Sequence, residues 1–129
     1  MPQDWIWVAS DVARAAHDEQ LAEHGGAAGV RDDGLLESAF ARPRNLADYG
    51  EPDAAALAAA YAFGVARNHP FVDGNKRTAA VVAETFLLIN GFELAATDAQ
   101  LVVAILALAA GDLSEDELAD WFRIHVRAL

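Results

Sequence analysis

Apolar residues recur every three or four positions over most of this chain, and polar breaks divide the pattern into six segments. That spacing is typical of amphipathic helices. The predicted helices span 10–24, 32–42, 53–68, 75–90, 98–110 and 114–125. Residues that favour helix ends lie at their borders: Ser10, Asp32 or Asp33, Asp53, Asp98 and Ser114 at the starts, and Gly25, Asn90-Gly91 and Gly111 after the ends. No segment shows sustained strand alternation, so we expect an all-α fold.

Two of the predicted helices carry apolar residues around their whole circumference. Between Thr78 and Ile89 of the 75–90 helix only Glu84 and Thr85 interrupt the apolar residues, and the 98–110 helix contains the unbroken apolar run 101–110. A helix that is apolar on every side is normally buried. We therefore expect a compact six-helix bundle in which these two buried helices are central and amphipathic helices surround them.

The segment 43–53 separates the second predicted helix from the third. Pro43 disfavours a helical conformation in the residue before it, so we expect the second helix to end near Arg42. Eleven residues make a long connection for a compact domain, and long connections often carry function. We expect a loop here, with room for a short flap hairpin between Arg44 and Glu51, and a plain connector is the alternative.

Length and composition limit the class of protein. A chain of 129 residues fits one domain, which we assign to 1–129, and 54% hydrophobic residues suffice for a buried core. The absence of cysteine excludes a disulfide framework, a thiolate zinc site and a cysteine nucleophile, and it fits a reducing, cytoplasmic location. The longest apolar run has ten residues, against the roughly 20 of a membrane span, so we expect no membrane partner.

Charge is unevenly distributed along the chain. Twenty acidic and nine basic residues give a net charge of −11, which repels nucleic-acid phosphates, so we expect no DNA binding by the protein itself. Five of the nine basic residues nevertheless lie between Arg42 and Arg77. Lys76 is the only lysine. It has a functional reason unless the chain's preference for arginine has left it there by chance.

The segment 69–78 places polar residues between two apolar helices. Gly74 and Asn75 stand at the start of the predicted 75–90 helix, where unpaired backbone N–H groups and the helix dipole attract anions. Gly74 also lets a phosphate approach the backbone closely. Lys76 and Arg77 add positive charge at the same helix end. The segment therefore predicts a phosphate site.

Two further residues of this segment supply groups for phosphate chemistry. Asp73 can hold Mg²⁺, which prefers one or two carboxylates together with substrate oxygens. His69 can accept the proton of an attacking hydroxyl, because imidazole exchanges protons near neutral pH. Each residue alone also fits an ordinary role as a cap, a turn residue or a solvated charge. Their combination within nine residues favours a site for phosphate transfer.

The run His69–Arg77 reads H-P-F-V-D-G-N-K-R, which resembles the H-x-F-x-(D/E)-(G/A)-N-(K/G)-R signature of the Fic/Doc family. The pattern around Gly25-Gly26, 31–39 and Arg42-Pro43 is also similar to Doc-type (death on curing) members. The resemblance implies a helical fold, with 43–53 at the position of the family's target-binding flap, and nucleotide-dependent modification of a protein hydroxyl. It further implies a role for each motif residue: His69 as general base, Asp73 as the Mg²⁺ ligand, and Gly74, Asn75, Lys76 and Arg77 as the phosphate-binding set.

Two positions distinguish branches of this family. Members that transfer AMP usually have glycine where this chain has Lys76, and a second arginine where it has Ala80. Both differences favour the Doc branch. That resemblance implies a toxin of a toxin–antitoxin pair that transfers the γ-phosphate of ATP to a threonine of translation elongation factor Tu, arrests translation and is neutralised by a Phd-like antitoxin. The alternatives are a Fic-like AMP transferase and a catalytically inactive binding module.

The remaining polar and aromatic residues are given structural interpretations. Arg67 is either a partner of the helix dipole or a further phosphate contact. The run 31–33 is interpreted as a helix start. Trp5 and Trp7 are expected to pack the N-terminal segment onto the bundle. The histidines outside the motif are expected to be satisfied core or surface residues rather than metal ligands, namely His17, His24 and His125.

Overall fold

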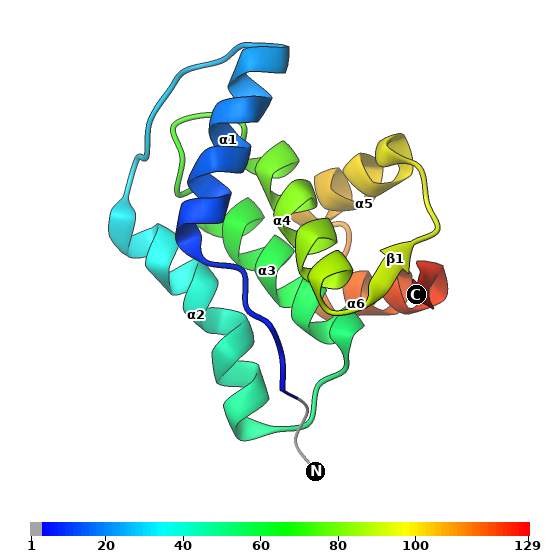
Figure 1. Ribbon diagram of the computed structural model, residues 1–129. Helices are drawn as coiled ribbons and strands as arrows, with labels where there is room; N and C mark the ends of the chain where they lie inside the picture. The colour runs from blue at the N-terminus through cyan, green and yellow to red at the C-terminus, as the bar shows by residue number, and fades with distance from the viewer. Residues whose placement is uncertain (1–3) are drawn as a thin grey trace.

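Six helices and one two-stranded sheet form the part of the chain that the computed structural model describes, residues 4–129 (Figure 1). This confirms the all-α prediction and its six helices. Their order is α1 (Ser10–His24), α2 (Asp33–Tyr49), α3 (Ala54–Asn68), α4 (Asn75–Ile89), β1 (Phe92–Leu94), α5 (Asp98–Ala110), α6 (Glu115–His125) and β2 (Val126–Ala128).

Helix α3 is the centre of the bundle, and it contacts α2, α4, α5 and α6. Eleven of its 15 residues are buried, most of them alanines, which let neighbouring helices approach closely. The closest approach is at Gly64, where an added Cβ would lie 2.9 Å from the Cα atom of Ala39 in α2. Aromatic rings fill the space beside α3, with Tyr61 packed edge-on against Phe40 at 5.4 Å between ring centroids.

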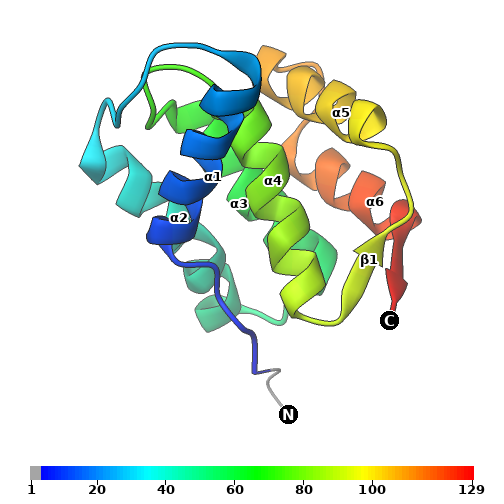
Figure 2. The ribbon, with the colours of Figure 1, turned by 45° about the horizontal axis from the view of Figure 1, so that its top comes forward.

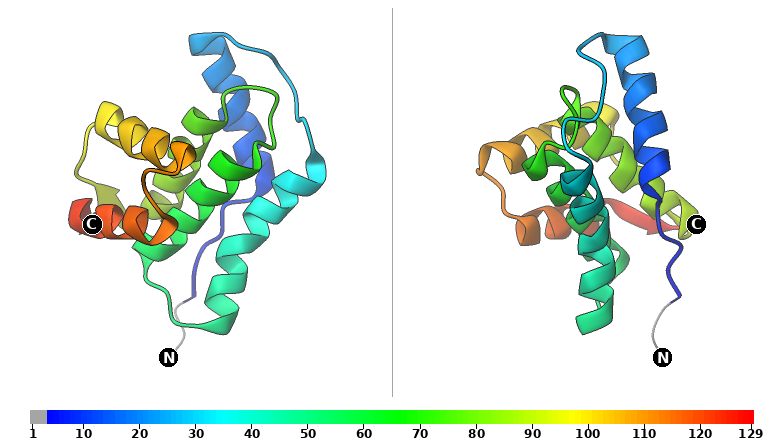
Figure 3. Two further views of the ribbon diagram at one scale, coloured as in Figure 1. Left: turned by 180° about the vertical axis from the view of Figure 1, so that it is seen from behind. Right: turned by 90° about the vertical axis from the view of Figure 1, so that its left-hand side faces the viewer.

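The identity of the second central helix differs from the sequence prediction. Helix α4 is central as expected, with eight of 15 residues buried. Helix α5 buries only four of 13 residues, and Val103 on its outer side is 63% exposed. Figure 2 and the left view of Figure 3 show α5 at the edge of the bundle. The second central helix is α3 instead. Its alanines contribute little hydrophobicity each, but their small side chains let neighbouring helices pack closely around it.

Helix α2 continues through Pro43 to Tyr49, so the predicted end near Arg42, the 43–53 loop and the Arg44–Glu51 hairpin are wrong. A proline inside a helix costs about 3 kcal/mol, because it removes one backbone hydrogen bond and crowds the preceding turn. Packing of α2 on α3 offsets that cost, since Pro43 itself is buried. The connection to α3 shrinks to residues 50–53.

Some predicted helix ends are confirmed and others shift by one residue. The side chain of Asp53 caps α3 by accepting the backbone N–H of Ala56 at 2.9 Å, and Ser114 forms the expected capping box of α6. Helix α5 is capped by Thr97 rather than Asp98. Ser10 does not cap α1, because it is already the first helical residue.

At the two ends of the described chain, some contacts with the bundle were not indicated by the sequence pattern and one was. Strands β1 and β2 pair antiparallel, with Glu93 opposite Arg127, and three residues are too few to show an alternating pattern. At the other end, the Tyr61 hydroxyl accepts the backbone N–H of Val8 at 2.9 Å. Trp5 and Trp7 lie 5.8 and 6.0 Å from the ring of Phe86, which confirms that they pack the N-terminal segment onto the bundle. No helix within residues 4–129 is long and apolar enough to span a bilayer.

Candidate functional site

The loop between α3 and α4, together with the first turn of α4, brings all six residues of the predicted site to one cavity of about 380 Å³. Its remaining wall is apolar, and comes from Val72 of the loop and from Val102 and Leu106 of α5. The polar members are His69, Asp73, Gly74, Asn75, Lys76 and Arg77.

His69 ends α3 in a left-handed backbone conformation, with φ 50° and ψ 55°. This conformation costs a residue with a Cβ roughly 1–2 kcal/mol. Arg31 stabilises it, because its Nε donates to the carbonyl oxygen of His69 at 2.7 Å and its Nη2 donates to that of Asn68 at 2.9 Å. The guanidinium thus satisfies two carbonyls at the negative end of the α3 dipole.

Arg31 therefore has a role that the sequence interpretation missed. The sequence interpretation takes the run 31–33 as a helix start, and Asp32 does cap α2 by accepting the N–H of Leu35 at 3.0 Å. Arg67 lies in the last turn of α3, as its interpretation as a dipole partner requires, and its guanidinium lies 5.6 Å from the centre of the Phe63 ring; it does not line the cavity. No local pattern could have identified Arg31, which is 38 residues before His69.

The segment before α2 also holds the loop through its backbone. The carbonyl oxygen of Pro70 accepts the N–H groups of Arg31 and Asp32, at 2.7 and 3.1 Å. Val72 donates its N–H to the carbonyl of Gly29 at 3.1 Å. Figure 1 and the right view of Figure 3 show the two segments side by side at one end of the bundle. The loop is thus fixed to the segment that precedes α2.

Asn75 uses its side chain within the loop. Its Oδ1 accepts the N–H of Phe71 at 2.9 Å, and its Nδ2 donates to the carbonyl oxygen of Phe71 at 3.0 Å. Asn75 is only 8% exposed. It can therefore offer a phosphate its backbone N–H, whereas its amide closes the loop.

The first turn of α4 has the features of an anion site. Gly74 occupies the N-cap position with φ 76°, and no side chain caps the helix. The N–H groups of the first turn therefore have neither a helical partner nor a side-chain cap. Lys76 and Arg77 are exposed, and within residues 4–129 neither forms an ion pair. Two unneutralised cations and free N–H groups favour a bound phosphate there.

Asp73 has the donor atoms for one Mg²⁺ contact. Its Oδ1 accepts the N–H of Gly74 at 2.8 Å. Its Oδ2 lies against Gly26, where an added Cβ would stand 2.8 Å away. The described residues contain no cluster of three or more metal-ligating side chains. A single carboxylate fits Mg²⁺ that arrives with a nucleotide, because the phosphates and water supply the other ligands.

The three histidines outside the motif lie where the prediction expected. His17 is 2% exposed and its Nε2 is bonded to the carbonyl oxygen of Asp73, so it is a satisfied core histidine. His125 bonds the carbonyl oxygen of Trp121 at 2.7 Å through Nδ1. His24 is an exposed residue 3.6 Å from Glu23.

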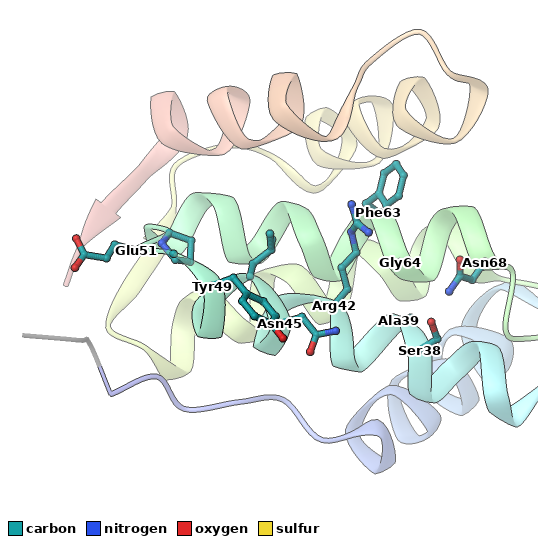
Figure 4. Close-up of a pocket in the computed structure, with 12 residues that line it drawn as sticks. Ser38, Ala39, Arg42, Asn45, Tyr49, Glu51, Phe63, Gly64 and Asn68 are labelled. Carbon is teal, nitrogen blue, oxygen red and sulfur yellow. The ribbon is translucent and has the colours of Figure 1, made fainter.

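Another cavity, of about 680 Å³, lies between α2 and α3. Figure 4 shows Asn45 and Tyr49 on α2 and Arg42 beside Phe63. The Arg42 guanidinium lies 4.6 Å from the centre of the Phe63 ring and also pairs with Glu115. None of the predicted site residues lines this cavity, although Asn68, the neighbour of His69, stands at one end. The size of this cavity does not by itself indicate a catalytic function.

Comparisons with known proteins agree with the motif. A family model described as "Fic/DOC family" matches residues 7–87. "Protein kinase doc" of Escherichia phage P1 is 34% identical over 110 residues, which are 84% of this chain and 86% of that protein. "Toxin Doc" of Mycolicibacterium smegmatis is 53% identical over 75 residues, 56% of this chain and only 57% of the toxin's length. The family match covers α1 through the loop and most of α4, and the chain belongs to the Fic/Doc family.

Proposed function

We propose that this protein is a Doc-like toxin that phosphorylates a target protein. The observation that carries the proposal is the single cavity in which His69, Asp73, Lys76 and Arg77 meet the uncapped end of α4. The name of the phage relative, a protein kinase, supports phosphoryl transfer. The proposed reaction moves the γ-phosphate of ATP to a threonine hydroxyl of elongation factor Tu, in the bacterial cytoplasm, and thereby arrests translation.

His69 acts in this proposal as the general base. It takes the proton of the threonine hydroxyl while the hydroxyl oxygen bonds to the γ-phosphorus and the bond to the β–γ bridging oxygen breaks. The products are phosphothreonine and ADP, and His69 then releases its proton to water. The left-handed backbone fixed by Arg31 directs His69 from the end of α3 into the cavity, where it can reach a bound substrate.

The remaining site residues bind and stabilise the phosphates. Asp73 would hold Mg²⁺, which neutralises phosphate charge in such reactions. Lys76, Arg77 and the backbone N–H groups of the first turn of α4 would stabilise the negative charge that spreads over the transferred phosphoryl oxygens. This catalysis is mainly positioning and electrostatics.

Transfer of AMP is the alternative reaction. Lys76 stands where AMP-transferring members usually carry glycine, and its side chain lines the cavity. Ala80, where such members carry a second arginine, is buried and offers no charge. A catalytically inactive binding module is the other alternative, and the exposed His69 and Asp73 argue against it.

The discriminating experiment uses ATP labelled at either the α- or the γ-phosphorus. The protein is incubated with Mg²⁺ and bacterial lysate, and in parallel with purified elongation factor Tu, and His69→Ala serves as the control. Transfer of the γ-label alone, abolished in the control, supports the kinase. Transfer of the α-label overturns it in favour of AMP transfer, and no transfer from either position favours a binding module.

The toxin part of the proposal has a separate test. Expression of the wild-type protein is expected to arrest growth of a bacterial host, whereas His69→Ala is not. Co-expression of a Phd-like antitoxin, sought in the neighbouring open reading frame, is expected to restore growth. Growth at the normal rate with active wild-type protein would contradict the toxin assignment but not the kinase assignment.

A further inference from the structure

His17 lies inside the bundle on α1, 56 residues before Asp73, and contacts the loop in two ways. Its ring stacks on that of Phe71, with centroids 4.1 Å apart and planes inclined by 8°. Its Nε2 lies 2.7 Å from the carbonyl oxygen of Asp73. A carbonyl oxygen only accepts hydrogen bonds, so Nε2 carries the hydrogen and donates it.

This hydrogen bond acts on a rigid unit that also holds the carboxylate of Asp73. The carbonyl of Asp73 and the N–H of Gly74 belong to one planar peptide group. His17 binds the carbonyl end of that plane, and Oδ1 of Asp73 accepts the N–H at its other end at 2.8 Å. Fixing the carbonyl therefore fixes the N–H, and the N–H orients the carboxylate.

The same plane leads directly into α4. Gly74 is the N-cap residue, in a left-handed conformation that a glycine adopts without strain. A rotation of the plane would therefore move both the carboxylate and the first N–H groups of the helix. Gly26 leaves the space next to Oδ2 open, since only a hydrogen stands where a Cβ would lie 2.8 Å from that oxygen.

We propose that His17 is a positioning residue for Asp73. It keeps the carboxylate and the N-terminus of α4 in the geometry that binds a metal-bound nucleotide, although His17 itself does not line the cavity. The inference rests on the proposed function, because the nucleotide is the ligand that this geometry serves. Partners that orient a ligating group commonly change metal affinity about 10–100-fold when they are removed.

Two substitutions separate the hydrogen bond from the packing. His17→Phe keeps a ring to stack on Phe71 but removes the donor. His17→Gln keeps an N–H donor at the position of Nε2 but removes the ring. His125→Phe is the matched control, because His125 also combines a 2.7 Å bond to a carbonyl with a ring contact, 4.3 Å from Trp121, away from the cavity.

The first readout is the binding of Mn²⁺ together with ATP, which is measured through the electron paramagnetic resonance signal of free Mn²⁺. We expect His17→Phe to weaken binding about tenfold, and His17→Gln to stay within about threefold of wild type despite a lower melting temperature. His125→Phe binds as wild type does. The proposal is wrong if His17→Phe binds normally, or if the loss of binding follows the loss of stability, so that His17→Gln binds more weakly than His17→Phe.

The second readout needs no nucleotide and separates this inference from the proposed function. Backbone ¹⁵N order parameters of Asp73 and Gly74 are expected to fall from about 0.85 to below about 0.6 in His17→Phe and to stay high in His17→Gln. If the wild-type protein binds no Mn²⁺–ATP, the proposed function fails and the order parameters alone decide the positioning role. Unchanged values in His17→Phe overturn it.

Discussion

Replacement of Asn75 by alanine distinguishes a side chain that holds the loop from one that binds a phosphate. Asn75 is 8% exposed, and its amide makes two hydrogen bonds to the backbone of Phe71, which is 1% exposed. Each such bond contributes about 0.5–1.5 kcal/mol, and a buried group left without its partner costs about 1–3 kcal/mol. We therefore expect Asn75→Ala to lower the free energy of unfolding by about 2–4 kcal/mol.

The corresponding change in melting temperature follows from the size of the chain. An unfolding entropy of about 2.1 cal/mol/K per residue gives about 0.27 kcal/mol/K for 129 residues. A loss of about 2–4 kcal/mol then lowers the melting temperature by roughly 7–15 °C. Circular dichroism at 222 nm, followed during heating and in urea, measures both quantities.

Three further variants serve as references for the stability and the activity of Asn75→Ala. Lys76→Ala and Arg77→Ala remove exposed cations, so we expect them to abolish phosphotransfer while changing stability by less than about 0.5 kcal/mol. Asn45→Ala removes an exposed amide on α2 and should change neither property. The reasoning fails if Asn75→Ala unfolds like wild type and loses only nucleotide binding, because its amide would then contact the phosphate directly.

Three further predictions concern Gly26 and Arg31 beside the loop, and the Arg123–Asp53 pair at the opposite end of α3. Gly26→Ala places a Cβ 2.8 Å from Oδ2 of Asp73, so the Mg²⁺ concentration for half-maximal phosphotransfer should rise about tenfold. Gly25 also has a positive φ, but an added Cβ there meets nothing within 4 Å, so Gly25→Ala should not shift that concentration. Equal shifts in the two variants would contradict a role for the contact between Gly26 and Asp73. Arg31→Met removes both bonds to the end of α3, so kcat should fall about tenfold with little change in the KM for ATP, whereas Arg14→Met should keep the wild-type kcat. The Arg123 guanidinium donates hydrogen bonds to the Asp53 carboxylate and lowers the pKa of that carboxyl. The pair therefore stabilises the fold at pH values above the ordinary pKa of aspartate, near 4. This contribution disappears as the pH falls through the lower pKa that Asp53 has in the folded protein. Because both side chains are about half exposed, Arg123→Gln should cost under about 1 kcal/mol at pH 7 in urea unfolding, with the difference from wild type vanishing in acid.

Local signals predicted the helices well where the relevant interactions lie within one turn. The caps at Asp53 and Ser114 bond N–H groups three residues away, so the residue spacing alone identifies them. The end of α2 was not predictable in this way, because contact with α3 keeps α2 helical past Pro43. Gly64 of α3 lies so close to Ala39 of α2 that no Cβ would fit between them. Such contacts have no signature in the residues around Pro43.

That the motif residues gather at one cavity was predictable for a similar reason, whereas the residues that hold the loop in place were not. The motif residues lie within nine positions, so their types and spacing already indicated a phosphate site. The residues that hold the loop come from much earlier in the chain, with Arg31 38 residues before His69 and His17 56 residues before Asp73. A buried histidine on a helix face gives no indication of which carbonyl it will meet.

The distribution of cation partners explains how a chain of net charge −11 can present an anion site. Carboxylates pair with the side chains of Arg14, Arg42, Arg123 and Arg127. Arg31 bonds two carbonyls, while Arg44 and Arg67 lie over the rings of Trp7 and Phe63. Among residues 4–129 this leaves Lys76 and Arg77 as the cations with no such partner, side by side at the uncapped start of α4. The acidic surface thus repels polyanions in general, whereas the local positive charge at this one helix end has no partner and favours the phosphates of the proposed nucleotide.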